Sequence, residues 1–484
     1  MTSPALDPDS LTIGIVHFGL GAFHRAHQAI YTEDAAAAAE ETHWGILGVT
    51  GRSDTVVRQL QPQDGLYGVL IREAHASSLR LVGSVRDVAW PGDRSGDVVE
   101  TLAAPTTHIV TLTITEQGYP LARGGGLDMG VPGVAEDRQI VANELRRPDA
   151  VAASRTPLGL LTRGLARRFR AGGSPLSVVS CDNLASNGAV LRTLILALSD
   201  GLDDGFSAWL RSDVAFPSTM VDRITPATTA ADRDEALALL GFEDQALVVA
   251  EPFAQWVIED SFAGPRPPWE LAGAIITHDV APYETVKLRV LNTVHLLLAW
   301  TGLLCGHRTI AEAVADPRLR TIVHDAIDDD ILPTLTAPQG IDLRSYCENV
   351  LERLANPALA HTTAQVGSGG SLKLPNRVVG TILDRLAAGA VPRQLAFMLA
   401  AWLVVIATSS EPGAHGLDDP AAEELRARVG SLTDLSRDPL AAVQRLLSFH
   451  EVFPEWISSH EGFAVAVANE LPRVEALMAE SRNP

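Results

Sequence analysis

Cysteine is scarce in this chain, and its few positions exclude several classes of protein. The three cysteines, Cys181, Cys305 and Cys347, show no CxxC or Cys/His ligand spacing. We therefore expect neither a disulfide framework nor a structural zinc site, and a reducing cytoplasm fits this composition. No basic segment leads into an apolar core at the N-terminus, so no secretory signal is predicted. Apolar runs such as 393–407 are too short to span a bilayer, and no transmembrane helix is expected.

Basic residues are also few relative to acidic ones. The chain has 38 Lys and Arg against 59 Asp and Glu, a formal net charge of −21. With no basic cluster beyond the short stretch 163–170, neither nucleic acid nor an anionic membrane is an expected partner. A chain of 484 residues, 46% of them hydrophobic, is long enough for two buried cores. The sequence gives no indication of oligomeric state.

A glycine turn follows the first apolar run. Residues 11–18 predict a buried strand, and an apolar-periodic helix follows the turn, through Tyr31 and Ala38. Gly19 would permit the tight turn, and Gly21 the approach of a pyrophosphate to the backbone N–H groups of Ala22 and Phe23 at the helix start. His24 replaces the third glycine of the usual dinucleotide fingerprint. A GxG sequence after a strand is equally often a plain turn.

Further apolar runs predict strands at 44–49, 69–72, 79–82 and 108–115, the last of which is a β-branched run of the kind that a parallel sheet buries. After the first of these, Asp54 would accept from the adenosine ribose hydroxyls, which favours NAD. Arg52 would suit a 2′-phosphate, so NADP stays open, and both residues also fit as solvated loop charges. The strand 108–115 closes on Glu116, where a nicotinamide would lie if this strand is central.

The strand 176–180 ends at Asn183, which would project from its carboxyl end toward a cofactor. Asn, Asp and Ser after a strand also commonly form a turn and a helix cap.

The best domain boundary lies at Pro282 and the polar residues before it. The sequence predicts an α/β Rossmann-type domain over 1–278 and a mostly α-helical domain over 279–484. Helices are expected at 283–306, 307–315, 318–334, 342–355, 375–389, 393–410, 420–429, 439–448 and 461–481.

The first of these helices carries polar groups in an otherwise apolar run. At ~100° per residue, Lys287, Glu284, His295 and Asn292 fall at about 0°, +60°, +80° and +140°. All four therefore point into one sector, which is how an amine, a carboxylate, an imidazole and an amide would be mounted in a cleft. They also fit an ordinary exposed Glu–Lys pair beside a satisfied core histidine.

The spacing Lys-x4-Asn-x2-His after a proline resembles the signature of the polyol-specific long-chain dehydrogenases, the family of mannitol 2-dehydrogenase and fructuronate reductase. The strings GLGAFHRAHQA (19–29), CDNLASNG (181–188), FPSTMVDRITPATT (216–229), EPFAQWVIEDSF (251–262) and GSGGSLKLP (367–375) are similar to the family as well. The resemblance runs from about residue 13 to residue 470.

The resemblance implies a Rossmann-type NAD(P)-dependent oxidoreductase for an open-chain polyol or aldonate. It places the family's oxyanion-hole asparagine on Asn183 and gives the substrate side to Asp222, Arg223, His361, Gln365 and Lys373. Two positions depart from the family pattern, Gly369 where it has Asp and Thr362 where its reductase branch has Arg. These departures would touch the distal end of the substrate, so the resemblance does not fix which polyol or acid is used.

The residues also suit this chemistry independently. Oxidation of a secondary alcohol needs a base for the hydroxyl proton, for which a neutral Lys287 is suited. It also needs donors for the forming alkoxide, which the amides of Asn183 and Asn292 supply. His295 would fix a substrate hydroxyl, Glu284 could relay the proton, and no metal is predicted. Two alternatives remain: a sugar-phosphate isomerase or lyase that uses the same lysine, and a non-catalytic nucleotide sensor.

Overall fold

The computed structural model of the chain describes residues 3–122, 124–147, 152–359, 361–409 and 416–482. It divides into two compact units, Met1–Ala281 and Pro282–Pro484. Each is described in turn.

A six-stranded sheet forms the centre of the first unit, and all of its strand pairs are parallel. Its order is β5-β2-β1-β6-β7-β8, the order of a doubly wound dinucleotide fold. The strands are β1 (Ile13–Phe18), β2 (Gly45–Val49), β5 (Val85–Ala89), β6 (Ile109–Leu112), β7 (Leu176–Ser180) and β8 (Val214–Ala215). The chain order reverses between β1 and β6, the point at which such sheets bind their ligands.

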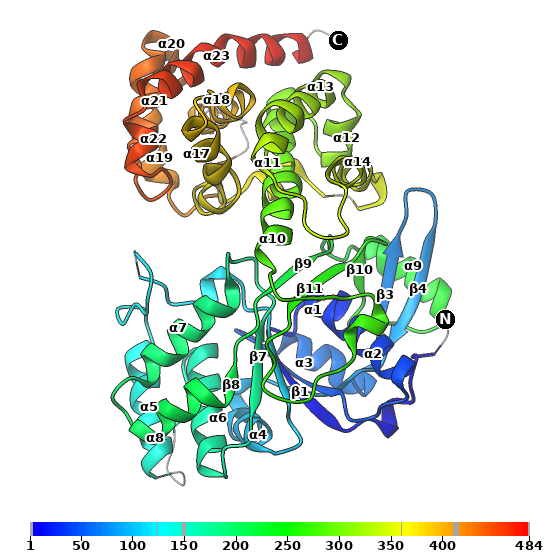
Figure 1. Cartoon of the computed structure of the whole chain (residues 1–484). Coiled ribbons are helices and arrows are strands. Elements are labelled where there is room, and N and C mark those ends of the chain that lie inside the picture. The colour runs from blue at the N-terminus through cyan, green and yellow to red at the C-terminus, as the bar shows by residue number, and fades with distance from the viewer. Residues whose placement is uncertain (1–2, 123, 148–151, 360, 410–415, 483–484) are drawn as a thin grey trace. The chain divides into compact units, whose positions relative to one another are not determined.

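Both faces of this sheet are buried because alternate residues of each strand feed different cores. On β1, Val16 and Phe18 pack with helices α4 (Pro91–Ala103), α5 (Val134–Arg146), α6 (Pro157–Arg170), α7 (Asn187–Ser199) and α8 (Asp204–Ser212). Ile15 packs on the other face, with α2 (Gln28–Ala39), Trp256 and Trp269. Figure 1 shows α4 to α8 together on one side of the strands. Burial on both faces explains the continuous apolar runs in the sequence.

Smaller elements complete this unit. One three-stranded sheet has the order β10-β3-β4 and a second has the order β12-β11-β9. Their strands are β3 (Tyr67–Arg72), β4 (Ser77–Val82), β9 (Thr219–Asp222), β10 (Val248–Ala250), β11 (Gln255–Glu259) and β12 (Ile275–Thr277). The remaining helices are η1 (Pro8–Ser10), α1 (Ala22–Ala26), α3 (Thr55–Leu60), η2 (Gln61–Gln63), η3 (Glu116–Gly118), α9 (Ala230–Leu240) and η4 (Trp269–Ala272).

Two local predictions for this unit are wrong. The helix after the glycine turn is not continuous, because His27 leaves helical geometry (φ −130°, ψ −87°) and separates α1 from α2. Its ring reaches the carbonyl of Gln255 at 2.9 Å. The strand predicted over 108–115 ends at Leu112, since Thr115 adopts a positive φ of 64° that no strand accommodates.

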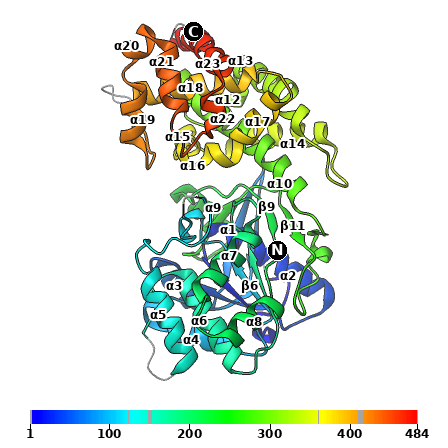
Figure 2. The same ribbon diagram turned by 60° about the vertical axis from the view of Figure 1, so that its left-hand side comes forward.

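The second unit is helical, and its described residues contain no strand (Figure 2). Its elements are α10 (Ala281–Lys287), η5 (Leu288–Asn292), α11 (Thr293–Cys305), α12 (Ile310–Ala315), α13 (Pro317–Asp325), η6 (Ala326–Ile331), η7 (Leu332–Thr334), α14 (Leu343–Leu354), η8 (Pro357–Leu359), α15 (Thr363–Gly367), α16 (Gly370–Leu374), η9 (Pro375–Val379), α17 (Gly380–Ala387), α18 (Arg393–Thr408), α19 (Ala422–Val429), α20 (Leu432–Arg437), α21 (Pro439–Leu447), α22 (Glu455–Ser458) and α23 (Glu461–Arg482). A Rossmann-type sheet followed by a mostly helical region confirms the predicted fold class.

Three segments in this unit, η5, η6 and η9, are π-helical. The sequence predicted ordinary helix through all three. A π turn holds one residue more than an α turn, so the regular 100° periodicity does not apply there.

The continuous helical stretch Ala281–Cys305 is, among the described residues, the one helix long and apolar enough to cross a membrane. From the sequence, no transmembrane helix was expected. However, 72% of its most apolar window is buried inside the protein, as in a core helix of a globular domain.

Stacked tryptophans fix the second unit's core around the glycines of 367–370. Trp300 of α11 and Trp402 of α18 stack with ring centroids 5.5 Å apart. A Cβ on Gly370 would lie 2.8 Å from the indole nitrogen of Trp402, and one on Gly367 would lie 3.1 Å from Trp300. The Gly-rich sequence therefore allows α15 and α16 to pack closely on the two indoles.

Candidate active site

The glycine turn after β1 lies at the carboxyl edge of the sheet. Gly19 has a φ of +94°, and a Cβ there would lie 2.1 Å from the carbonyl oxygen of Thr113, so the fold itself requires glycine. Gly21 differs, because its φ is −94° and a Cβ would meet only the carbonyl of Gly19 at 3.7 Å. No packing in the described part of the chain requires glycine at position 21. Ala22 and Phe23 begin α1, where helical N–H groups lack intrahelical acceptors.

His17, on strand β1, stabilises this turn through hydrogen bonds, and it was not predicted as a functional residue from the sequence. Its ring nitrogens lie 2.7 Å from the hydroxyl of Thr111 and 3.0 Å from that of Thr113. Thr113 in turn donates to the carbonyl of Gly19 at 2.8 Å. Burial lowers the pKa of His17 to about 3, so the ring is neutral at physiological pH. A lone histidine inside an apolar strand was the available signal.

The loops after β2 and β6 flank the turn. Arg52 donates to the side chain of Gln117 at 2.8 Å, which links the two loops, and Glu116 lies exposed beside that contact. Asp54 pairs with Arg58 at 3.1 Å, one turn further along α3. Asp54 and Arg52 thus both lie at this edge, each with a neighbour on the protein.

Asn183 is exposed just after β7, and its neighbour Asp182 holds the loop that follows β6. The Asp182 carboxylate accepts from the N–H of Thr115 at 2.7 Å and from the hydroxyl of Tyr119 at 2.7 Å. Burial raises the pKa of Asp182 to about 6, and these hydrogen bonds oppose the shift. Asp182 is a second residue that the sequence reasoning passed over, because an Asp after a strand is usually read as a cap.

Asp222 is the last residue of β9 and is buried. The next residue, Arg223, is also buried, and its side chain stabilises the fold. The Arg223 guanidinium donates to the carbonyls of Glu251 (2.8 and 3.0 Å) and Ala26 (2.6 Å). It thereby ties α1 to the segment after β10.

In the second unit, the π turn η5 changes the geometry that the sequence predicted for Lys287 and Asn292. Lys287 ends α10, and Asn292 is the last residue of η5. A π turn closes its hydrogen bonds between residues five apart, so these two side chains project closer together around the helix axis than the separation of about 140° predicted for a regular α-helix. Both are buried, with 6% and 8% of their surface exposed. Glu284, one α turn before Lys287, is half-buried.

His295 follows on α11 and meets His361 edge to face, with ring centroids 4.8 Å apart. Nε2 of His295 and Nδ1 of His361 are buried and have no hydrogen-bond partner in the described part of the chain. Burial lowers the pKa of His295, and His361, Arg377, Lys373 and Arg353 lower it further. Burial, and then Lys373, lowers the pKa of His361 to about 4. Two neutral imidazoles therefore lie in a positively charged environment.

Lys373 on α16 donates to the carbonyl of Val366 at 2.9 Å, while Gln365 is exposed on α15. The protein has 38 Lys and Arg residues, and only two of them, Lys287 and Lys373, are lysine. Every other one of these basic residues is an arginine, so Lys287 and Lys373 carry the only side-chain ammonium groups of the sequence. A guanidinium cannot give up its proton in a protein, whereas an ammonium can.

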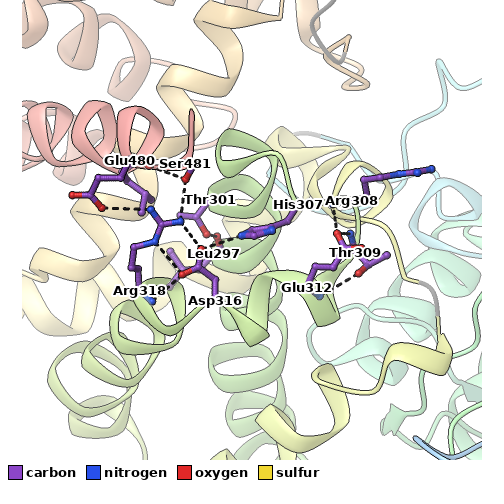
Figure 3. A network of polar contacts seen from close by, with 11 residues as sticks. Leu297, Thr301, His307, Arg308, Thr309, Glu312, Asp316, Arg318, Glu480 and Ser481 are labelled. Atoms are coloured by element: carbon purple, nitrogen blue, oxygen red, sulfur yellow. Dashed lines mark hydrogen bonds and ion pairs between the residues drawn. The ribbon is translucent and has the colours of Figure 1, made fainter. Parts of the chain in front are cut away.

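One group of ligand-type side chains occurs elsewhere in the second unit. The ligand atoms of Cys305, His307 and Asp316 lie within 4.8 Å of one another. However, Arg318 donates to both carboxylate oxygens of Asp316 (2.6 and 3.1 Å), as Figure 3 shows. A cation would have to displace that guanidinium, so the group is better explained as an ionic network. Arg318 also contacts Ser481 at 3.0 Å and thus joins α13 to α23.

Comparison with known proteins identifies the family. The mannitol dehydrogenase Rossmann domain matches residues 13–271, and the mannitol dehydrogenase C-terminal domain matches residues 279–475. The chain belongs to the mannitol dehydrogenase family. D-mannonate oxidoreductase of Escherichia coli (strain K12) is 35% identical over 96% of this chain and 93% of its own length. Mannitol 2-dehydrogenase of Phaeosphaeria nodorum is 35% identical over 88% of this chain and 75% of its own length.

Members of the mannitol dehydrogenase family with solved structures share the whole fold. The ternary complex of Pseudomonas fluorescens mannitol 2-dehydrogenase with NAD and D-mannitol superposes with a TM-score of 0.86, at 33% identity over 99% of this chain and 96% of that one. A substrate-free D-sorbitol dehydrogenase gives 0.83 at 30% identity, over 99% and 97%. The resemblance inferred from the sequence is confirmed.

Proposed function

We propose that this member of the mannitol dehydrogenase family is an NAD-dependent dehydrogenase that interconverts an open-chain polyol or aldonate and its keto form, with Lys287 as general base. The observation that carries this proposal is the lysine usage. Only two of the chain's 38 basic residues are lysine, Lys287 and Lys373, and Lys287 is buried one π turn before Asn292. Unlike the guanidinium of an arginine, the amine of a lysine can exchange a proton.

Residues 1–278 would bind the nucleotide and residues 279–484 would carry the base and the substrate contacts. The open space at Gly21 and the N–H groups of Ala22 and Phe23 fit a pyrophosphate. Asp54 would accept from the adenosine ribose, which favours NAD, and Glu116, in the loop after the central strand β6, would contact the nicotinamide end. Arg52, already linked to Gln117, would have to change partner to bind a 2′-phosphate.

When bound, NAD supplies the acceptor for the hydride that leaves the substrate carbon. Lys287 takes the hydroxyl proton as the carbon–oxygen bond becomes a carbonyl, and Glu284, one turn away, relays it to solvent. The amide of Asn292 donates to the oxygen while negative charge develops on it, and the family resemblance gives Asn183 the same role. Such a donor contributes about 3 kcal/mol to the transition state.

The distal part of the substrate would lie against the two histidines and Lys373. The unpartnered nitrogens of His295 and His361 are suited to substrate hydroxyls, because a neutral imidazole both donates and accepts. Gln365 and Asp222 complete the proposed substrate side. Both a polyol and an aldonate fit this description.

The reaction as proposed needs no metal, because the amide donors stabilise the alkoxide that a Lewis acid would otherwise hold. The three cysteines are free, which supports a cytoplasmic location. The expected partners are small sugar alcohols, keto sugars or sugar acids, with neither nucleic acid nor membrane involved.

Absorbance of NADH in the presence of D-fructose or D-fructuronate, with and without a chelator, tests the proposal. Oxidation that resists the chelator is the expected result. Oxidation that the chelator abolishes would contradict metal independence. Binding of NADH without turnover would favour a nucleotide sensor, and neither binding nor turnover would favour an isomerase or lyase.

A further inference from the structure

The π turn between Lys287 and Asn292 is held by a side chain outside it. Thr293, the first residue of α11, is fully buried. Its hydroxyl donates to the carbonyl of Arg377 at 2.9 Å and lies 3.3 Å from the carbonyl of Leu288. Leu288 begins η5 and Arg377 lies within η9. One hydroxyl therefore connects two π-helical segments that are distant in the sequence and packed against each other.

This contact has a specific physical role. A π turn departs from the regular α-helical ladder of backbone hydrogen bonds, so a contact from outside the turn can favour it over a regular α turn. The hydroxyl of Thr293 has a single proton and lies within hydrogen-bond distance of two part-buried carbonyls, one from each segment. Replacement of Thr293 by valine removes this hydroxyl donor from both carbonyls. Valine has nearly the same shape as threonine, so the packing of the side chain is unchanged.

We propose that Thr293 is a positioning residue for hydride transfer, because its hydroxyl holds the π turn that sets Lys287 and Asn292 in line. This inference rests on the proposed function of those two residues. Thr293 is too deeply buried to meet a substrate, so it acts only through its neighbours. Relaxation of η5 toward a regular α turn would rotate Asn292 away from Lys287, and a displacement of about 1 Å in such a site lowers the rate by about 10²-fold.

The test compares Thr293→Val with Thr301→Val in the complete enzyme. Thr301 lies on the same helix, is equally buried, and donates to the carbonyl of Leu297 at 2.6 Å (Figure 3). Its bond is an ordinary one to the preceding turn, so it controls for loss of a buried hydroxyl. We expect Thr293→Val to lower kcat by about 10- to 100-fold and to shift the low-pH limb of the rate profile. The Kd of NAD should not change, and Thr301→Val should keep near wild-type kcat.

A Thr293→Val variant with wild-type kcat and pH profile would overturn the inference. If the valine variant does not fold, Thr293→Ser and Thr293→Ala decide, because both lose the methyl group and only serine keeps the hydroxyl. A higher kcat in Thr293→Ser than in Thr293→Ala supports the proposal, and equal kcat values in the two variants overturn it. Absence of NADH-dependent turnover in the wild-type protein itself would instead refute the proposed function, and this inference with it.

Discussion

His295 and His361 meet edge to face with ring centroids 4.8 Å apart, although 66 positions separate them in the chain. Each ring keeps a buried nitrogen that no described residue contacts by a hydrogen bond. The pair therefore offers two neutral, directional groups at the place where the proposed substrate hydroxyls would lie.

Replacement of Lys287 by Ala or by Arg should lower kcat for alcohol oxidation by about 10² to 10⁴. Alanine removes the base, and arginine keeps the charge but cannot lose a proton. The Kd of NAD, measured by fluorescence titration, should stay near the wild-type value, and the low-pH limb of the rate profile should vanish. Near wild-type kcat in Lys287→Arg would mean that the residue is no base.

The same hypothesis can be checked by direct titration. Because the chain has only two lysines, ¹³C reductive methylation labels Lys287, Lys373 and the N-terminal amine alone. A general base should titrate well below the ordinary value of about 10.4, and a Lys373→Arg variant assigns the signals by NMR. A Lys287 signal that titrates at the ordinary value would argue against its role as base.

Asn292→Ala should lower kcat by about 10²- to 10³-fold in both directions of the reaction, because its donor would serve the same oxygen whichever way the hydride moves. Oxidation of the alcohol and reduction of the ketone are measured separately at saturating NAD and NADH. A loss confined to one direction would assign the amide to substrate binding instead.

Gly21→Val should raise the KM for NAD strongly and leave the fold intact, since the added side chain meets open space in the protein and the nucleotide would have to enter that space. Circular dichroism checks the fold and initial rates give the KM. Gly96→Val, in helix α4 with nothing within 4 Å of its added Cβ, is the matched control. Equal KM values for the two variants would show that the turn has been misassigned.

His361 should make the protein less stable as the pH falls from 7 to 5. Its pKa is about 4 in the fold and about 6.5 when unfolded, so the unfolded chain binds the proton first and folding stability decreases with falling pH. The full effect at pH 5 is at most about 2 kcal/mol. Urea unfolding of the wild type and His361→Gln at both pH values measures it, and the variant should lose less stability. Equal losses of stability in the wild type and in His361→Gln would show that another group causes the sensitivity to acid.

Much of this architecture could be predicted because its causes are local. A buried parallel strand is an apolar run, and Gly19 follows β1 where only glycine can turn. The π turn at 288–292 could not be predicted in this way, since the hydroxyl of Thr293 reaches Arg377, 84 positions away. The roles of His17 and Asp182 likewise depend on partners on other strands. A polar residue in an apolar run was visible in the sequence, but its partner was not.

The stacked indoles of Trp300 and Trp402 in the second unit contribute to the optical signal of the protein, beside the packed pair Trp256 and Trp269 of the first unit. Aromatic rings held rigidly in a chiral environment produce near-ultraviolet circular dichroism, which disappears when tertiary packing is lost even if the helices remain. Since α15 and α16 rest on these two rings through Gly367 and Gly370, the signal reports on the segment that carries Gln365 and Lys373. If a sugar binds to this segment as proposed, we expect its binding to change the signal, which can be measured without a label and without turnover.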